Sequence, residues 1–250
     1  MRILQSGAEI GDPLAPYLDV DRSRPRHDCW VTGHMVAGID GTAARSGRVG
    51  ALSTAADQEL FRRMRQIADV VLVGAETVRR ERYGPVRLSE QARAARAQLG
   101  RPPIPPVAVV SRSLDLDWSA PLFTRPEART YVVTCAGADP ARIADAEAVA
   151  TVVVAGDERV DPARALAALA GLGHRVVLCE GGPRWLGELV AAERLDELCL
   201  TVTPVIGGDP LPVCVNPPGN DVTPFRLHHA MIEEDGTMFL RYQHRGGQDG

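Results

Sequence analysis

A chain of 250 residues, 45% of them hydrophobic, can bury a substantial core, either as one α/β domain or as two smaller ones. Its formal charge of −4 and the lack of any run of like charge give no sign of the basic surface that nucleic-acid binding needs, so we expect no nucleic-acid partner. Because no apolar run is long enough for a membrane span or a signal peptide, we expect a cytoplasmic protein without a membrane partner.

The basic and sulfur-containing residues narrow the chemistry further. All 28 basic residues are arginines, so no step of a reaction can use a lysine. The 5 cysteines include no close pair, and most of them lie in apolar runs. We interpret them as buried structural thiols and expect no bound metal.

The first half of the chain starts with an irregular stretch, which we predict as an N-terminal extension over residues 1–25 before a single domain over 26–245. Residues 30–41 are predicted as a strand closed by the Asp40-Gly41 turn. Ser53 or Thr54 would cap a helix with apolar residues at helical spacing, and residues 70–74 form a short buried strand.

The second half repeats this alternation of helices and strands. Residues 89–100 are predicted helical, followed by strands at 107–111, 130–135 and 151–156. The last two are uncharged and β-branched, which is typical of strands buried on both faces. Asp161 would cap a helix, 174–179 and 198–206 are strands, and a hairpin turns at Asp235-Gly236. The sequence therefore predicts an α/β fold with a mostly parallel sheet, helices on both faces and a C-terminal antiparallel hairpin.

The stretch Leu178–Leu189, LCEGGPRWLGEL, is the strongest candidate for a ligand site. Gly181 and Gly182 allow a ligand to approach the backbone closely, and Pro183 opens a helix whose free amides suit a phosphate. An ordinary strand-to-helix turn would look similar. The difference is Glu180, because a carboxylate at the mouth of a buried strand needs a partner.

Three other turns lie where ligands gather in an α/β sheet, beyond the carboxyl ends of strands. Gly74 and Thr77 form a possible phosphate cradle, although many strands simply end in glycine. Ser111 and Arg112 leave a strand together and would grip a phosphate monoester, unless they form a solvated loop. Asp40 is either a turn residue or a carboxylate for a substrate.

Taken together, the segments MVAGIDG, LSTAAD, ADVVLVGAETVR, VVSRS, CEGGPRWLGELV and DELCLTVTPVIGG resemble a known family. It is the pyrimidine reductase domain of riboflavin biosynthesis, the carboxyl-terminal half of the bacterial bifunctional deaminase-reductase. The resemblance covers about residues 26–244. It implies a three-layer dihydrofolate reductase-like fold and, because no deaminase half precedes it here, a stand-alone reductase.

The resemblance implies NADPH as cofactor and a homodimer. It places Gly74, Thr77 and the Gly181-Gly182-Pro183 turn at the cofactor, with Ser111 and Arg112 on its 2′-phosphate. It places Asp40 and Glu180 at the substrate, where either would act in catalysis. The implied reaction is hydride transfer to C1′ of 5-amino-6-(5-phosphoribosylamino)uracil, which turns its ribosylamino group into ribitylamino.

The chain departs from the family's pattern near the substrate phosphate. The family usually has a lysine after Asp-Gly, where this sequence reads DGTAAR, and the segment RRERYGPVRL also differs. We predict Ser53, Arg79 and Arg87 in the substrate region, with Arg79, Arg82 or Arg87 supplying the missing charge. Two alternatives are a dihydrofolate or pterin reductase on the same fold, and a non-catalytic NADPH-binding or sensing module.

Overall fold

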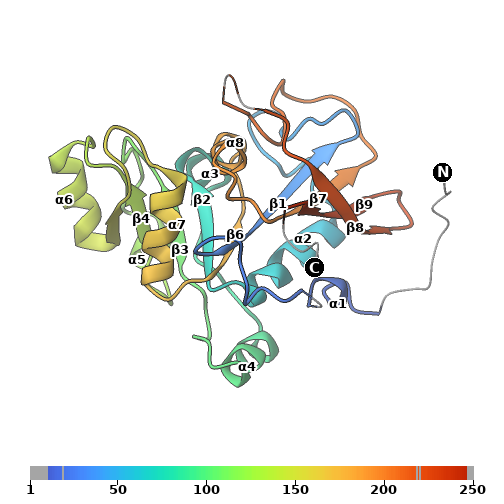
Figure 1. Cartoon of the computed structure of the whole chain (residues 1–250), viewed down its shortest axis with the longest axis horizontal. Coiled ribbons are helices and arrows are strands. Elements are labelled where there is room, and N and C mark those ends of the chain that lie inside the picture. Colours follow the sequence, from blue (N-terminus) through green and yellow to red (C-terminus); the bar gives the residue numbers. More distant parts are fainter. Residues whose placement is uncertain (1–10, 19, 218, 220, 247–250) are drawn as a thin grey trace.

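Figure 1 shows the computed structural model, which describes residues 11–18, 20–217, 219 and 221–246. Within these residues one sheet has nine strands in the order β5-β4-β3-β2-β6-β1-β7-β9-β8. The strands are β1 (Trp30–Gly38), β2 (Val70–Gly74), β3 (Val107–Val110), β4 (Tyr131–Thr134), β5 (Thr151–Val154), β6 (Val176–Cys179), β7 (Glu197–Thr203), β8 (Phe225–Ile232) and β9 (Met238–His244). All neighbouring pairs from β5 to β7 are parallel, and β9 is antiparallel to both β7 and β8. The predicted fold class is confirmed.

The helices begin where the sequence offers caps. Thr54 accepts from the backbone of Asp57 at the start of α2, and Asp161 accepts from Arg164 before Pro162 opens α7. The helices are α1 (Ala15–Leu18), α2 (Ala55–Met64), η1 (Arg65–Ile67), α3 (Ala75–Glu81), α4 (Glu90–Gln98), α5 (Pro121–Thr124), α6 (Pro140–Val149), α7 (Pro162–Gly171) and α8 (Pro183–Ala191). The sequence did not predict α3, α5 and α6, although Asp139 and Pro140 give α6 the same start as α7.

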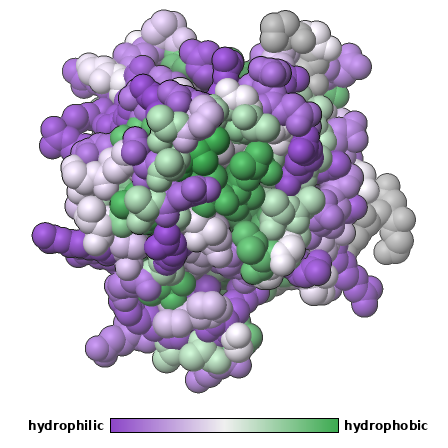
Figure 2. Space-filling model, turned by 90° about the vertical axis from the view of Figure 1, so that its left-hand side faces the viewer, coloured by the Kyte–Doolittle hydropathy of each residue, from purple (hydrophilic) through white to green (hydrophobic). Residues whose placement is uncertain are grey.

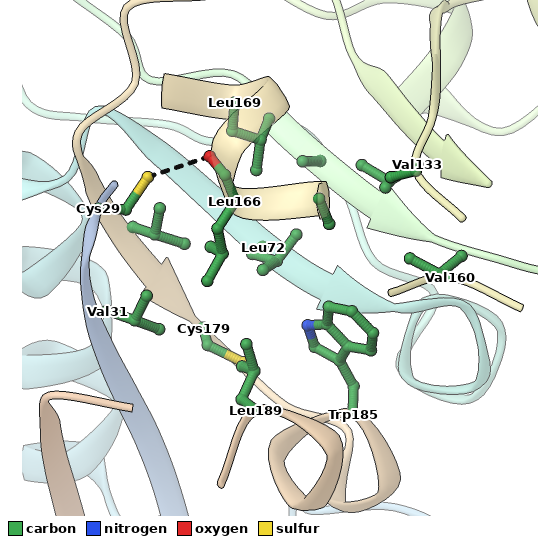
Figure 3. Close-up of a cluster of buried hydrophobic side chains, with 14 of the residues drawn as sticks. Cys29, Val31, Leu72, Val133, Val160, Leu166, Leu169, Cys179, Trp185 and Leu189 are labelled. Atoms are coloured by element: carbon green, nitrogen blue, oxygen red, sulfur yellow. Dashed lines mark hydrogen bonds between the residues drawn. The ribbon is translucent and has the colours of Figure 1, made fainter. Parts of the chain in front are cut away.

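Helices α7 and α8 cover one face of the sheet. Their apolar sides, among them Leu166, Leu169 and Trp185, pack on Leu72 and Cys179 from the central strands. Figure 3 shows this cluster, with the Cys29 thiol donating to the carbonyl oxygen of Leu166 at 3.3 Å. Burial raises the pKa of Cys29 to about 12, so this thiol stays protonated and behaves as a small apolar side chain.

The opposite face carries α2, α3 and α5, and part of it is covered by the N-terminal segment. Leu14 and Tyr17 are almost fully buried there and pack with Leu60 and Met64 of α2. Arg22 reaches from the same segment to the buried carboxylate of Glu197, at 3.2 Å. The described part of the predicted extension therefore packs on the sheet and contains one short helix, while residues 1–10 lie outside the described range.

The prediction that residues 151–156 form a strand buried on both faces was wrong. Strand β5 lies at the edge of the sheet and pairs only with β4; its first three residues are half-buried and Val154 is exposed. Figure 2 looks onto this end of the molecule and shows apolar side chains grouped among polar ones. A β-branched run fits a central and an edge strand equally well, because its composition carries no information about its neighbours.

Two further observations concern ligands and membranes. None of the helices in the described part of the chain is both long and apolar enough to cross a bilayer. Among the same residues, no three His, Cys, Asp or Glu side chains are grouped so as to hold a metal ion.

Candidate active site

A cleft of about 1370 Å³ opens beyond the carboxyl ends of β1, β2, β3 and β6. This volume exceeds the roughly 300–1,000 Å³ of a pocket for one drug-sized ligand, so the cleft has room for two ligands side by side. Most of the residues that the sequence singled out line it: Ser53, Gly74, Thr77, Arg79, Ser111, Arg112, Glu180, Gly181, Gly182 and Pro183.

The Gly-Gly-Pro turn forms one wall of this cleft. Gly181 has a φ of +88°, and the peptide bond between it and Gly182 is cis. A Cβ on Gly182 would lie 2.8 Å from the Thr77 hydroxyl oxygen, and one on Gly181 would lie 3.3 Å from the Met35 sulfur. Only glycines fit this packing, and α8 then starts at Pro183 with its amino end beside the cleft.

The other proposed phosphate cradle is partly used up by the fold. The Gly74 amide donates to the carbonyl oxygen of Gly181 at 2.9 Å, so it holds two turns together and is not free for a phosphate. The hydroxyl of Thr77 faces Gly182 across the same contact. Gly74 and Thr77 therefore lie at the predicted place and shape the wall of the cleft.

Glu180 has the partner that its position demanded. Its carboxylate is fully buried and accepts from Arg65 Nε at 2.7 Å and from Arg65 Nη2 at 2.8 Å, a two-pronged ion pair. The Tyr83 hydroxyl also donates to Glu180. The Arg65 guanidinium lies against the rings of Phe61, 4.9 Å from its centre, and Tyr83, 5.4 Å from its centre.

This arrangement fixes the charge states at the floor of the cleft. Burial alone would lower the pKa of Arg65, but Glu180 and Tyr83 together outweigh it and the pKa lies above its ordinary value. Burial, and then the same carboxylate, raise the pKa of Tyr83 well above the ordinary range. Arg65 and Glu180 therefore form a neutral pair, and Tyr83 keeps its proton for donation.

A second polar group lies beside the first. His34 on β1 is level with Glu180, because Gly33 pairs with Cys179 in the preceding register position. The His34 ring lies 5.2 Å from the ring of Phe61, and its Nε2 is 3.8 Å from Asp57 Oδ1. Asp57 Oδ2 accepts from the Ser53 hydroxyl at 2.5 Å. The predicted Ser53 therefore lines the cleft and also positions this carboxylate.

The far end of the cleft carries the groups predicted for a phosphate. Ser111 is buried, and its hydroxyl accepts from the Leu114 amide at 3.0 Å, which fixes the turn after β3. Arg112 is exposed beside it. Arg142, from the first turn of α6, also lines the cleft and donates to the carbonyl oxygen of Ser113 at 3.0 Å. Two arginines therefore flank this turn, where the sequence indicated one.

Two predicted site residues do not reach the cleft. The Asp40 carboxylate accepts from the Thr42 amide of its own turn at 3.1 Å and from the Gly207 amide of a distant segment at 2.8 Å. These amides hold the pKa of Asp40 below its ordinary value, with the Gly207 amide contributing most. Arg87 is likewise absent from the lining. Asp40 therefore stabilises the backbone around its turn, and we assign neither Asp40 nor Arg87 to the proposed site.

The cleft residues that the sequence did not single out include Arg65, Tyr83, His34, Asp57 and Arg142. One signal for Arg65 was present, because a buried Glu180 required a cation and the chain offers no lysine. Nothing local separates Arg65 from its neighbours in FRRMRQ, so the pattern could not indicate which arginine pairs.

The sequence profile of the RibD C-terminal domain matches residues 29–240. The chain belongs to this family. The RibD C-terminal domain family thereby confirms the resemblance drawn from the CEGGP and VLVGAETVR motifs, and the match spans the whole cleft.

Individual relatives agree with the family. A 2,5-diamino-6-ribosylamino-4(3H)-pyrimidinone 5′-phosphate reductase of Archaeoglobus fulgidus is 29% identical over 188 residues, which cover 74% of this chain and 85% of the relative. The crystal structure of a pyrimidine reductase-like protein of Corynebacterium diphtheriae is 26% identical, with a TM-score of 0.77 over 94% of this chain and 95% of the other.

A more distant structure shares the fold. It is a diaminohydroxyphosphoribosylaminopyrimidine deaminase/5-amino-6-(5-phosphoribosylamino)uracil reductase of Thermotoga maritima, 19% identical, with a TM-score of 0.64. The match covers 86% of this chain and 56% of that one.

Proposed function

We propose that this member of the RibD C-terminal domain family is an NADPH-dependent reductase of riboflavin biosynthesis. Its substrate would be a phosphorylated ribosylaminopyrimidine, whose ribosylamino group becomes ribitylamino. The observation that carries the proposal is one cleft of about 1370 Å³ in which the Gly181-Gly182 turn meets the Glu180–Arg65 pair. Family membership and the reductase names of the relatives support it.

The residues of the cleft fit a dinucleotide phosphate. Gly181 and Gly182 line the cleft without side chains, and the amino end of α8 adds free amides and a positive dipole end. Arg112 and Arg142 would flank the 2′-phosphate that distinguishes NADPH from NADH. When bound, the cofactor supplies a hydride.

The chain's own groups would orient the substrate and set the charge around it. Arg65 holds the buried Glu180 carboxylate on the cleft floor, and the Asp57 carboxylate lies near His34. A carboxylate favours the positive iminium character that develops at the reacting carbon before hydride transfer, and Glu180 is our candidate for that role. Arg79 and Arg82 line the cleft and are our candidates for the substrate phosphate, although Arg79 also donates to the Asp115 carbonyl oxygen at 2.7 Å.

The test is NADPH oxidation by the purified chain, followed at 340 nm with the phosphoribosylaminopyrimidine and, separately, with dihydrofolate. We expect turnover of the pyrimidine and formation of the ribitylamino product by mass spectrometry. Turnover of dihydrofolate alone would show that the substrate is a pterin and not the pyrimidine. NADPH binding without turnover of either compound would show that the protein is a non-catalytic binding module.

We also propose a homodimer, as the resemblance implies. The edge strand β8 supports an association surface, because Leu227 and Ile232 on it are exposed. Light scattering on the purified chain tests this, and a monomer at micromolar concentration would contradict it.

A further inference from the structure

Asp57 is a buried carboxyl group whose hydrogen bonds the protein itself leaves incomplete. Asp57 is 3% exposed, and its Oδ1 has no hydrogen-bond partner among the residues that the structure describes. Within the described part of the chain, the nearest nitrogen of a basic side chain is His34 Nε2, at 3.8 Å. Arg65, the neighbouring cation on the cleft floor, gives both prongs of its guanidinium to Glu180.

His34 does not supply the missing cation. Burial lowers the pKa of His34 below its ordinary value, against the opposing effects of Asp57 and Glu180, so the ring is neutral near pH 7. Its Nδ1 is also buried without a partner. Two unsatisfied polar atoms therefore lie in residues that both line the cleft. Leaving such atoms unpaired is costly, which indicates that a ligand completes their hydrogen bonds.

We propose that Asp57 is a specificity-determining residue that accepts hydrogen bonds from an amino group and the adjoining ring N–H of the pyrimidine. The chain would then prefer 2,5-diamino-6-ribosylamino-4(3H)-pyrimidinone 5′-phosphate, the compound in the name of the Archaeoglobus relative, over the uracil form. This inference rests on the proposed function and selects the substrate of the same cleft.

The two pyrimidines differ at one ring position, and that position decides the hydrogen bonds. The diaminopyrimidinone has an amino group at C2 beside the N–H at N3, so two neighbouring donors face a carboxylate. The uracil has a carbonyl at C2, which turns one of those donors into an acceptor. A carboxylate oxygen facing a carbonyl oxygen gains no hydrogen bond, and the like partial charges repel.

The structure also explains why a carboxylate can hold this orientation. The Ser53 hydroxyl donates to Asp57 Oδ2, and the backbone of Asp57 is held in the first turn of α2 by Thr54. Oδ1 is the oxygen that remains for the amino group. Because the site is built around hydrogen bonds to donors, we expect a preference of about tenfold or more in kcat/KM for the 2-amino form.

The experiment measures kcat/KM for both pyrimidines with saturating NADPH, for the wild-type chain and for Asp57→Asn. An asparagine amide can donate to the C2 carbonyl of the uracil while its oxygen accepts from N3–H, so Asp57→Asn should shift the preference toward the uracil by about tenfold or more. The matched control is Asp145→Asn, an exposed aspartate on α6 away from the lining, which should leave the ratio unchanged.

Each outcome decides between the claims. Preference for the uracil by the wild type, or an unchanged ratio in a folded Asp57→Asn chain that still binds NADPH, overturns the role of Asp57 and leaves the proposed function standing. If the wild-type chain turns over neither pyrimidine, the proposed function is overturned. In that case calorimetric binding of 2-amino-4(3H)-pyrimidinone and of uracil to wild type and Asp57→Asn still tests the recognition, and equal affinities would refute it.

Discussion

Replacing Arg65 by leucine would leave the Glu180 carboxylate buried without its cation. The Glu180 side chain is fully buried and the Arg65 side chain is 14% exposed, so solvent offers the abandoned carboxylate little compensation. Breaking a buried pair from one side costs about 3–5 kcal/mol, and the Tyr83 hydroxyl can offset only part of that as one hydrogen bond of about 1.5–3 kcal/mol. We therefore expect Arg65→Leu to lower the free energy of unfolding by about 3 kcal/mol.

The assay is urea unfolding followed by the fluorescence of the three tryptophans. The matched control is Arg93→Leu, which breaks a two-pronged pair with Glu127 of similar length, at 2.6 and 2.9 Å, on the exposed surface. We expect no measurable change there, because solvent screens such a pair. The double variant Arg65→Leu/Glu180→Leu removes the stranded charge and should recover most of the loss. A small effect of Arg65→Leu, or a double variant no more stable than the single one, would refute the burial argument.

Three further predictions concern other parts of the molecule. Arg112→Ala should raise the KM for NADPH by about tenfold or more and that for NADH hardly at all, as steady-state kinetics would show; equal losses would remove Arg112 from the 2′-phosphate. Gly187→Ala should destabilise the protein by about 1–3 kcal/mol in urea unfolding, although alanine favours helices, because its Cβ would lie 1.9 Å from the carbonyl oxygen of Val215; greater stability would contradict the contact. Burial holds the pKa of folded His34 below its ordinary value of 6.5. Below about pH 6.5 the unfolded chain therefore takes up a proton at this histidine before the folded chain does, and the free energy of unfolding falls as the pH is lowered. His34→Gln should therefore flatten the fall in unfolding midpoint between about pH 6.5 and 5, and parallel curves would argue against a neutral His34.

Local patterns predicted most of the strands and the glycine-rich wall of the cleft. The run VVLVG and the turn at Asp235-Gly236 determine their conformations through side-chain branching and turn geometry, and both were confirmed. The Gly181-Gly182-Pro183 turn was found for the same reason, since glycine and proline restrict or free the backbone directly.

The rest depends on contacts between segments far apart in the sequence. Arg65 and Glu180 are 115 residues apart, and nothing near either one encodes the other. The environment of β5 was wrong because only the sheet order places it at an edge. Asp40 was assigned to the substrate from its place at a strand end, whereas its carboxylate accepts from the nearby Thr42 amide and from the Gly207 amide, which is 167 residues away in the sequence.

Helix α2 contributes residues to the cleft and also packs against the N-terminal segment, which lies before the range that matches the family. Asp57, Leu60, Phe61 and Met64 share one face of α2; Asp57 and Phe61 line the cleft, and Leu60 and Met64 pack with Leu14 and Tyr17. The family match begins at residue 29 and so omits this backing. The helix that carries Asp57 is thus supported by side chains from before the matched range, so a chain trimmed to that range would lose part of the packing behind its own cleft.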